Sequence, residues 1–446
     1  MAKAGGGELA MAQAPTVYET YVQQFRALEE HLRLPPWLQQ MRREALGRFL
    51  GLGFPTARRG NEPWKYTDLR PLAATPFQEP PQEERSFPWR RFLPWSPGWD
   101  TVVVVAGVPR SWHVRPEGPW VGDLRRALAE APQALEEHLA RYAIYHDDAF
   151  AALNTALFQD LVVVMVPPGI AVRRPLHVAF VAPDAPLPYA QYPRLLVLLG
   201  RGARLVLVES YVGQAPGPYM TAAVTEVFLD EGASLEHYRL LLEEEAYHIG
   251  LLRMRQERDS HLRSLFFGRG CRIGRNDVRV ELDGPGAEAY LWGLYVTQGQ
   301  EHLDNYINID HIKPHCTSRL IYRGILDGAS HAIFGGTVYV RPGAVKTDAE
   351  QEDKNLLLSR EAEVDSKPSL EIYADDVKCG HGAAAGALAQ DALFYMRSRG
   401  LDEATATLLL IKGFAAAVLD EVRLPRLRTF LERATVAALP RLKTLP

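Results

Sequence analysis

The sequence lacks the short motifs that identify many enzymes and metalloproteins. It has no GxxxxGK[ST] phosphate-binding loop, no GxGxxG dinucleotide fingerprint and no GxSxG nucleophile elbow. It also has no CxxC pair, which excludes a zinc ribbon and a CxxC-type cluster site. Any chemistry must therefore come from dispersed residues or from a partner, and we expect this chain to bind no nucleotide.

Cysteine is scarce, and no targeting segment stands out. Cys271, Cys316 and Cys379 lie far apart in the sequence, and their odd number argues against a disulfide framework. A reducing compartment fits this usage. The first 15 residues lack the apolar core of a secretory signal, and apolar runs such as 161–166 are too short to span a bilayer. We therefore expect a soluble, cytoplasmic protein that does not engage a membrane.

Charge of one sign is not in excess. The 50 basic and 54 acidic residues give a net charge of −4, which provides no basic surplus for nucleic acid. An acidic run at Glu350, Glu352 and Asp353 is expected at the surface. With 446 residues, 47% of them apolar and 23% charged, the chain has ordinary globular composition and enough length for several domains.

The first 160 residues are expected to form a helical domain with a linker and a short strand segment. Residues 16–50 indicate two helices separated by Pro35-Pro36, because proline interrupts a helix. Residues 76–97 are rich in Pro, Glu and Arg and predict a loop. A β-branched run at 101–108 predicts a strand, and residues 124–158 show helical spacing of Ala and Leu.

Residues 161–376 are expected to form a strand-rich core with a weak internal repeat. Segments that start at residues 202, 232, 259, 286 and 316 are separated by 30, 27, 27 and 30 residues, and they read GARLVLVES, GASLEHYRLLL, DSHLRSLFF, GAEAYLWGLY and CTSRLIYRGIL. A near-constant period of this kind is typical of a solenoid. Regularly spaced short strands also occur in a sandwich, and the pattern alone leaves the two folds equally open.

Residues 377–446 are expected to form a carboxy-terminal helical domain. Helical spacing covers residues 388–399, resumes after an N-cap at Asp402, and returns at 424–438. If the core is a solenoid, these helices are expected to cap its open edge, which would otherwise invite aggregation.

Residues 303–318 concentrate potential metal ligands, namely Asp304, Asp310, His311, His315 and Cys316. Imidazole and thiolate suit transition metals, and carboxylates add harder donors. The spacing matches no defined ligand pattern, so a polar strand face followed by a proline-containing turn is the favoured interpretation.

A second neighbourhood is VKCGHGAAAG at 377–386. Cys379 and His381 are two residues apart, so both side chains would lie on one face of an extended backbone. A thiolate and an imidazole on one face can bind iron or receive sulfur, and the surrounding Gly and Ala residues permit close approach of another surface. A glycine-rich turn with a buried thiol explains the same residues equally well.

Several long blocks resemble the SufB/SufD family of iron–sulfur cluster assembly scaffold proteins. In chain order they are NEPWKYTDL, HIKPHCTSRLIYRGILDGASHAIFGGTVYV, KTDAEQEDKNLLLS and KPSLEIYADDVKCGHGAAAGALAQDALFYMRSRGLDEATATLLLIKGFAAAVLDEV. They extend over residues 61–422. The CGHG at 379–382 is similar to the SufD branch, since SufB members usually carry a Glu-His-Glu-type segment there. Gly380 and Ala384 replace the Ser and Thr that are frequent in SufD, and neither change removes a potential ligand.

The resemblance implies a mostly β fold, with a right-handed parallel β-helix core between amino-terminal and carboxy-terminal α-helical domains. It further implies a non-enzymatic subunit of a complex with SufB and the ATPase SufC. Such a subunit would support iron acquisition and de novo cluster assembly at the SufB–SufD interface, with transient iron or an Fe–S cluster shared with SufB. The isolated chain is also a candidate for homodimerisation.

The resemblance also implies residue roles. Cys379 and His381 would lie at the nascent cluster, with His381 the stronger candidate. Four neighbours would lie at the SufB interface, namely Val377, Lys378, Gly380 and Gly382. The SufC-binding candidates are Phe394, Tyr395, Arg397, Arg399, Leu408, Ile411 and Phe414.

Two alternatives remain at this point. The chain is a SufB-type scaffold paralogue, or it is a β-helix enzyme that acts on polysaccharide. The second would need two carboxylates close together, for which Asp304 and Asp310 are the candidates. The missing secretion signal argues against it.

Overall fold

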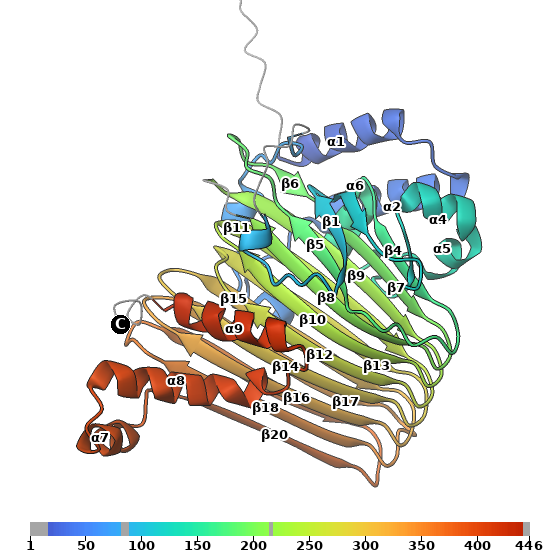
Figure 1. Ribbon diagram of the computed structural model, residues 1–446. Coiled ribbons are helices and arrows are strands. Elements are labelled where there is room, and N and C mark those ends of the chain that lie inside the picture. The colour runs from blue at the N-terminus through green and yellow to red at the C-terminus, as the bar shows by residue number, and fades with distance from the viewer. Residues whose placement is uncertain (1–16, 82–88, 214–216, 440–446) are drawn as a thin grey trace, which may run out of the picture.

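A computed structural model describes residues 17–81, 89–213 and 217–439 (Figure 1). The amino-terminal stretch read for a secretory signal, residues 82–88 of the predicted loop, and the end of the predicted carboxy-terminal domain lie outside the described residues.

Strands dominate the chain. They are β1 Asp100–Val105, β2 Val108–His113, β3 Trp120–Gly122, β4 Val162–Val166, β5 Leu176–Val181, β6 Ala190–Gln191, β7 Arg194–Leu199, β8 Arg204–Gly213, β9 Tyr219–Leu229, β10 Ser234–Glu243, β11 Ala246–Gln256, β12 His261–Gly268, β13 Ile273–Leu282, β14 Glu288–Thr297, β15 His302–His311, β16 Thr317–Leu326, β17 His331–Val340, β18 Asp348–Leu357, β19 Glu363–Ile372 and β20 Lys378–Gly386.

Helices flank the strands at both ends of the chain. They are α1 Val17–His31, α2 Pro36–Leu52, α3 Arg70–Ala73, α4 Leu124–Glu130, α5 Pro132–His138, α6 Ala149–Leu157, α7 Gln390–Ser398, α8 Glu403–Leu419 and α9 Pro425–Ala437, with short 3₁₀ turns at Glu62–Trp64 and Trp89–Arg91. The predicted helical stretch 124–158 is three helices, and Pro132 begins the second of them. None of the described helices has the length and apolar character needed to cross a bilayer.

The strands form two sheets that share one winding chain. Sheet I has the order β2-β1-β5-β8-β10-β12-β14-β16-β18-β20, and sheet II runs β19-β17-β15-β13-β11-β9-β7-β4-β3, with β6 beside β9. From β8 onward, consecutive strands alternate between the sheets, and every neighbour within a sheet is parallel. Each coil therefore contributes one strand to each sheet. This arrangement is a β-solenoid, which confirms the fold prediction and rules out the antiparallel sandwich.

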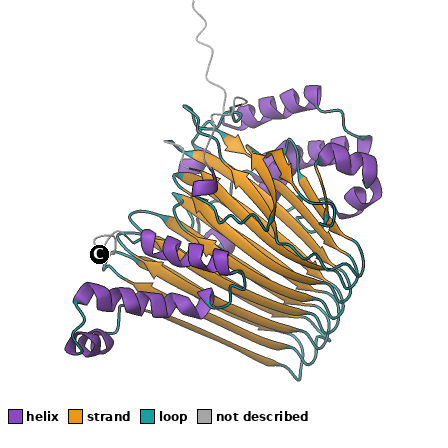
Figure 2. Cartoon of the chain, in the orientation of Figure 1, coloured by secondary structure: helices purple, strands orange, loops and turns teal. Residues whose placement is uncertain are grey.

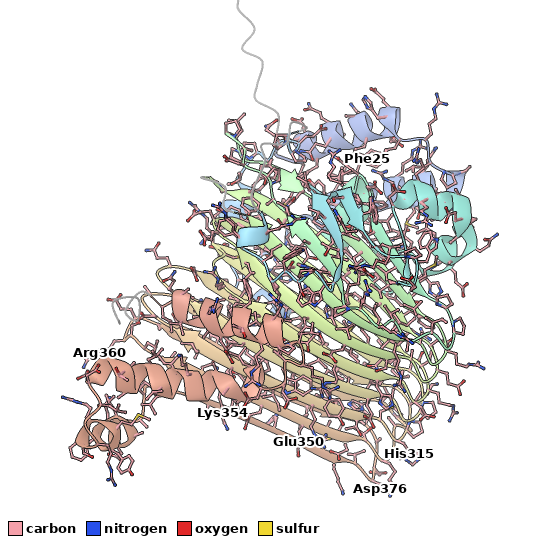
Figure 3. All side chains as sticks on the ribbon, viewed as in Figure 1. Phe25, His315, Glu350, Lys354, Arg360 and Asp376 are labelled. Carbon is pink, nitrogen blue, oxygen red and sulfur yellow. The ribbon has the colours of Figure 1, made fainter. Side chains whose placement is uncertain are left out.

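A left-handed backbone turn sets the period of the coils. Two residues before each sheet I strand from β8 to β20, the backbone φ is positive, and the residues are Gly202, Gly232, Asp259, Gly286, His315, Lys346 and Asp376. Each turn bonds to the next coil, as where the Gly202 N–H donates to the Glu231 carbonyl at 2.8 Å. The spacing read from the sequence is the spacing of these turns, which stack along one edge of the solenoid (Figure 3 labels His315 and Asp376 there).

Three apolar cores hold the molecule together. The inner faces of both sheets enclose the largest one, which runs from Val102 to Ala362. The amino-terminal helices pack on the outer face of sheet II through residues such as Phe49 and Phe150. The carboxy-terminal helices pack on the outer face of sheet I through residues such as Ile411 and Val418. Each sheet is thus buried on both faces along part of its length.

The carboxy-terminal helices do not cap the solenoid, so the end-cap prediction is wrong. Helix α8 contacts β14 and β16, which lie well inside sheet I. Among the described residues, no strand or helix covers the free edges of β19 and β20 (Figure 2). The apolar stripe of α8 is satisfied by the outer face of sheet I, and this leaves the final coil open. The strands also continue beyond residue 376, the predicted end of the core, because β20 belongs to sheet I.

The amino-terminal segment is attached to sheet II by buried charges. Glu226 on β9 is fully buried and accepts hydrogen bonds from the backbone N–H groups of Ala140, Tyr142 and Ala143, each at 2.9 Å. It also pairs with the buried guanidinium of Arg194. One carboxylate therefore fixes the turn between α5 and α6 and neutralises an arginine inside the protein.

Replacing Glu226 by alanine should lower the free energy of unfolding by about 3 kcal/mol or more. The change leaves Arg194 and three backbone N–H groups buried without their acceptor. Chemical denaturation followed by tryptophan fluorescence measures the loss. Glu231→Ala is the matched control, because its pair with Arg201 is exposed and should change stability by less than about 1 kcal/mol. Equal losses in the two variants would contradict this assignment.

Candidate functional site

The candidate site is the open final coil formed by β19 and β20. Strand β20 pairs with β18 on one side only, and β19 pairs with β17 on one side only. A β-carbon added at Gly380, Gly382 or Gly386 would meet no atom within 4 Å. The segment is therefore small, extended and unobstructed, and its backbone edge is available for pairing with another strand.

Cys379 and His381 lie on the inner face of this coil. The register places Cys379 beside Ala349 and His381 beside Gln351, and Ala349 belongs to the interior core. Cys379 is half-buried against that core, whereas His381 is exposed. The structure thus brings the two side chains to one face of an extended strand, and the glycine-rich-turn interpretation of this segment is wrong.

The thiol of Cys379 is protonated by its surroundings. Burial raises the pKa of Cys379 above its ordinary value, and the nearby Asp348 carboxylate raises it further, while a hydrogen bond from the Ala349 backbone lowers it. The thiolate is the form that binds metals and attacks sulfur. A cation or a partner group near the open coil would therefore be needed to favour ionisation.

Beneath the final coil lies a polar group that sequence reasoning missed. Asp353 on β18 is fully buried, so the prediction that the whole acidic run is at the surface is wrong for this residue. Its Oδ2 accepts hydrogen bonds from Ser366 at 2.6 Å and from Asn355 at 2.7 Å. Its Oδ1 is buried without a partner among the described residues. Alternation along β18, which points Ala349 inward, was the signal that places Asp353 inside.

The pKa of Asp353 reflects this burial. Removal from water raises the pKa of its carboxyl from 3.8 to about 6, although the bonds from Ser366 and Asn355 and the charge of Arg323 lower it. A carboxyl group with such a pKa changes protonation near neutral pH. It lies under the same open coil as Cys379 and His381.

The potential ligands in residues 303–318 do not converge. On β15, Asp304 pairs with Arg275 and Asp310 pairs with Arg341 at 2.7 Å. His311 points inward and bonds to Ser318 at 2.8 Å. His315 is one of the left-handed turn residues, and Cys316 is fully buried. The polar-strand interpretation is confirmed.

The same strand excludes the glycosidase geometry. Asp304 and Asp310 are six residues apart on β15, which corresponds to about 20 Å at about 3.3 Å per residue. Paired catalytic carboxylates of glycosidases lie roughly 5 to 9.5 Å apart. Each aspartate is also neutralised by its own arginine.

The carboxy-terminal candidates divide into exposed and buried groups. On α7, Phe394 and Tyr395 are 74% and 59% exposed, and the Arg399 guanidinium lies 5.2 Å from the centre of the Tyr395 ring. Arg397 is also exposed. In contrast, Ile411 is fully buried against sheet I, while Leu408 and Phe414 are partly buried in the same core. A partner can reach the aromatic pair on α7, whereas Ile411 is occupied by packing.

Comparisons with known proteins agree with this architecture. A family model described as "SUF system FeS cluster assembly, SufBD core domain" matches residues 181–414, and one described as "SufBD protein N-terminal region" matches 106–178. The iron–sulfur cluster assembly protein SufD of Escherichia coli is 29% identical over 392 residues, which cover 85% of this chain and 88% of that protein.

Two further relatives extend the likeness. Protein ABCI7, chloroplastic, of Arabidopsis thaliana is 29% identical over 426 residues, which cover 92% of this chain and 89% of that protein. An iron–sulfur cluster assembly SufBD family protein of Synechocystis is 32% identical over 304 residues, which cover 66% of this chain and 67% of that protein. The likeness therefore includes the open coil and the helices around it.

Replacing Asp353 by asparagine should remove a pH-dependent loss of stability. The pKa of Asp353 in the folded chain, about 6, lies above its ordinary 3.8, so wild type loses stability as the pH rises through this window. The variant should gain about 2 to 3 kcal/mol relative to wild type between about pH 4 and pH 7. Urea unfolding at a series of pH values measures the difference.

Glu350→Gln controls for the loss of one charge from β18, because Glu350 points outward and is exposed. The effect of this control should not grow with pH as that of Asp353→Asn does. A difference between Asp353→Asn and wild type that is flat from pH 4 to pH 7 would show that burial does not perturb this carboxyl.

Proposed function

This chain belongs to the SufB/SufD family of iron–sulfur cluster assembly proteins, and on that premise we propose that it acts as a SufD-like, non-enzymatic subunit of the assembly scaffold. Its final coil would meet a SufB partner, and iron and sulfur would be combined at that interface. The observation that carries this proposal is the unobstructed coil that presents Cys379 and His381 on one face.

Strand pairing is the proposed mode of contact with SufB. Because the Lys378 N–H bonds back to Thr347, alternation directs the backbone groups of Cys379, His381, Ala383 and Ala385 toward the free edge. Those groups need acceptors and donors from another chain, as in other complexes built by strand addition. Val377, Lys378, Gly380 and Gly382 would flank the joint, where the missing side chains of the glycines allow close approach.

His381 is the proposed iron-binding contribution of this chain. An exposed neutral imidazole binds borderline metal ions such as iron without first losing a buried proton. Cys379 requires deprotonation, since burial raises the pKa of its thiol. We therefore assign His381 to iron capture, and Cys379 to a thiolate that forms only once a cation or the partner is in place. The iron or nascent cluster would be transient cargo shared with SufB.

The energy source is assigned to a second partner. The sequence has no phosphate-binding loop, so ATP hydrolysis would belong to the ATPase SufC. The exposed surface of α7, with Phe394, Tyr395, Arg397 and Arg399, would dock SufC, and Leu408 and Phe414 would support it from α8. Cluster assembly with free thiols requires a reducing compartment, and we assign the protein to the cytoplasm.

His381→Ala should abolish most cluster assembly without preventing complex formation. The variant keeps the backbone of β20 and loses only an exposed side chain. Purified complexes with SufB and SufC, loaded anaerobically with iron and sulfide, are followed by visible absorption and iron content. His113→Ala on β2, at the far edge of sheet I, is the matched control and should assemble clusters normally. Normal assembly by His381→Ala would remove this residue from the mechanism.

Ala383→Pro should weaken the contact with SufB by at least about tenfold. Proline removes an N–H that faces the free edge and leaves the pairing with β18 intact, as tolerated on edge strands. Ala383→Ser keeps that N–H and serves as the control. Size exclusion with light scattering gives the mass of mixtures with SufB and SufC, and that of the isolated chain, which reports homodimerisation. An undiminished complex with Ala383→Pro would exclude strand addition.

A further inference from the structure

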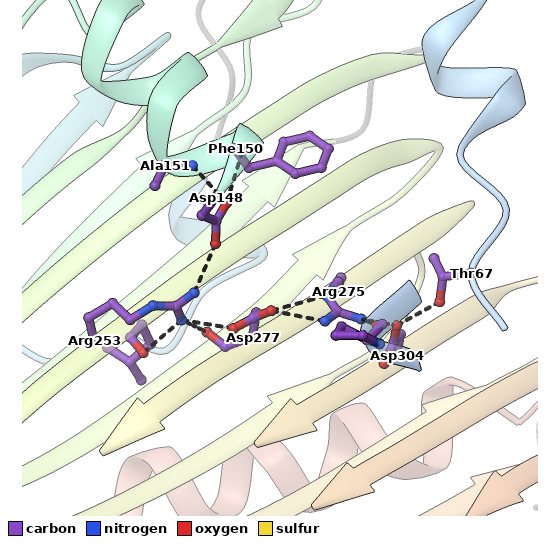
Figure 4. A network of polar contacts seen from close by, with 10 residues as sticks. Thr67, Asp148, Phe150, Ala151, Arg253, Arg275, Asp277 and Asp304 are labelled. Carbon is purple, nitrogen blue, oxygen red and sulfur yellow. Dashed lines mark hydrogen bonds and ion pairs between the residues drawn. The ribbon is translucent and has the colours of Figure 1, made fainter. Parts of the chain in front are cut away.

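A polar chain crosses the outer face of sheet II under the amino-terminal segment. Figure 4 shows its first part, which links Asp148, Arg253, Asp277, Arg275, Asp304 and Thr67. In this buried part every carboxylate is neutralised by a guanidinium. The Thr67 hydroxyl donates to Asp304 at 2.6 Å and so connects the chain of charges to the segment that covers the sheet.

The chain continues toward the open end of sheet II. His302 bonds through Nε2 to the Thr67 hydroxyl at 3.1 Å, and its ring meets the His331 ring at 5.0 Å between centroids with an angle of 79°. On β19, Glu363 lies opposite His331 in the parallel register, and Asp365 follows on the same face. The His331 Nε2 lies 2.8 Å from the Asp365 Oδ2.

The charges at this end are not balanced as they are in the buried part. No arginine or lysine forms an ion pair with Glu363 or Asp365 within the ranges that the structure describes. The nearest ammonium groups are engaged elsewhere, since Lys367 pairs with Glu62 and Lys65 lies over the Tyr66 ring at 4.8 Å. Two carboxylates and one imidazole thus converge on a half-exposed position that lacks a cation.

We propose that His331, Glu363 and Asp365 bind a divalent first-row transition-metal ion of the class of Fe²⁺, Mn²⁺ and Zn²⁺. One ligand atom from each residue lies within 4.8 Å of the other two. Metal–ligand distances of about 2.0 to 2.2 Å place adjacent donors about 3 Å apart, and the His331–Asp365 contact already has that length. Glu363 closes the site by a side-chain rotation. An imidazole with two carboxylates suits these ions and disfavours Ca²⁺ and Mg²⁺, which take oxygen ligands.

The surroundings support a metal site over a simple His331–Asp365 hydrogen bond. The hydrogen bond alone gives Glu363 no role, although β19 places it across from His331. His302, held by Thr67, packs edge-on against the His331 ring and restricts its rotation, as outer groups do around metal ligands. The site goes beyond the proposed function, because it lies on the outer face of sheet II, whereas Cys379 and His381 face the interior of the coil.

Zn²⁺ binding by the full-length chain tests the proposal. A background variant with Cys379→Ala and His381→Ala excludes the final coil as a source of ligands. By isothermal titration calorimetry it should bind one equivalent of Zn²⁺. Mn²⁺ should bind at the same position, as judged by quenching of its free electron paramagnetic resonance signal and by competition with Zn²⁺.

Adding Glu363→Gln and Asp365→Asn should weaken Zn²⁺ binding by more than about 100-fold, since loss of outer-shell partners alone costs 10- to 100-fold. Glu361→Gln, an exposed acid on the preceding turn, is the matched control and should change the affinity by less than about twofold. The ligands are half-exposed, so unfolding curves should match those of the background. A background chain that binds no Zn²⁺, or ligand variants that bind it equally well, would overturn the proposal, whatever the result for cluster assembly.

Discussion

The parallel ladder between successive coils is the constraint on which the rest of the structure depends. In a solenoid, the backbone of each coil is satisfied only by the coil before it and the coil after it. Every sheet I turn repeats this rule with a left-handed residue whose N–H reaches the next coil. Such a ladder has no internal way to end. The short antiparallel strands β2 and β3 flank its first coils, whereas the last coil keeps a free backbone edge among the described residues.

That unfinished edge explains why the two helical regions lie where they do. Each sheet has an apolar outer face that must be covered, and the helices bury these faces. Covering the faces takes up α8 and α9, so no described helix remains for the end of the solenoid. The free edge is a liability for an isolated chain and an asset for a subunit that pairs with a similar one. Its composition of Gly and Ala keeps bulky groups away from the joint.

Polar groups inside and outside the solenoid follow a common electrostatic rule. In deep positions each carboxylate has an arginine or several hydrogen-bond donors, as Glu226 has both. Toward the open end these partners become fewer, and Asp353 keeps one oxygen unsatisfied while Glu363 and Asp365 lack a cationic side chain. Buried or clustered carboxylates without such partners are costly unless protons or metal ions bind them. The final two coils are therefore the part of the chain where cations are most favoured.

The sequence by itself determined the period, the family and the position of the reactive pair. The repeat spacing follows from a turn that needs a left-handed residue once per coil, so it is visible in one dimension, and a spacing of two places Cys379 and His381 on one face of any strand. The tertiary structure alone decided between solenoid and sandwich, because strand direction leaves no mark on a short apolar run. It alone placed α8 on a sheet face, where an amphipathic stripe specifies burial without specifying the surface. It also placed Asp353 inside and brought His331 to Glu363 and Asp365, since contacts between coils join residues about 30 apart that no local pattern connects.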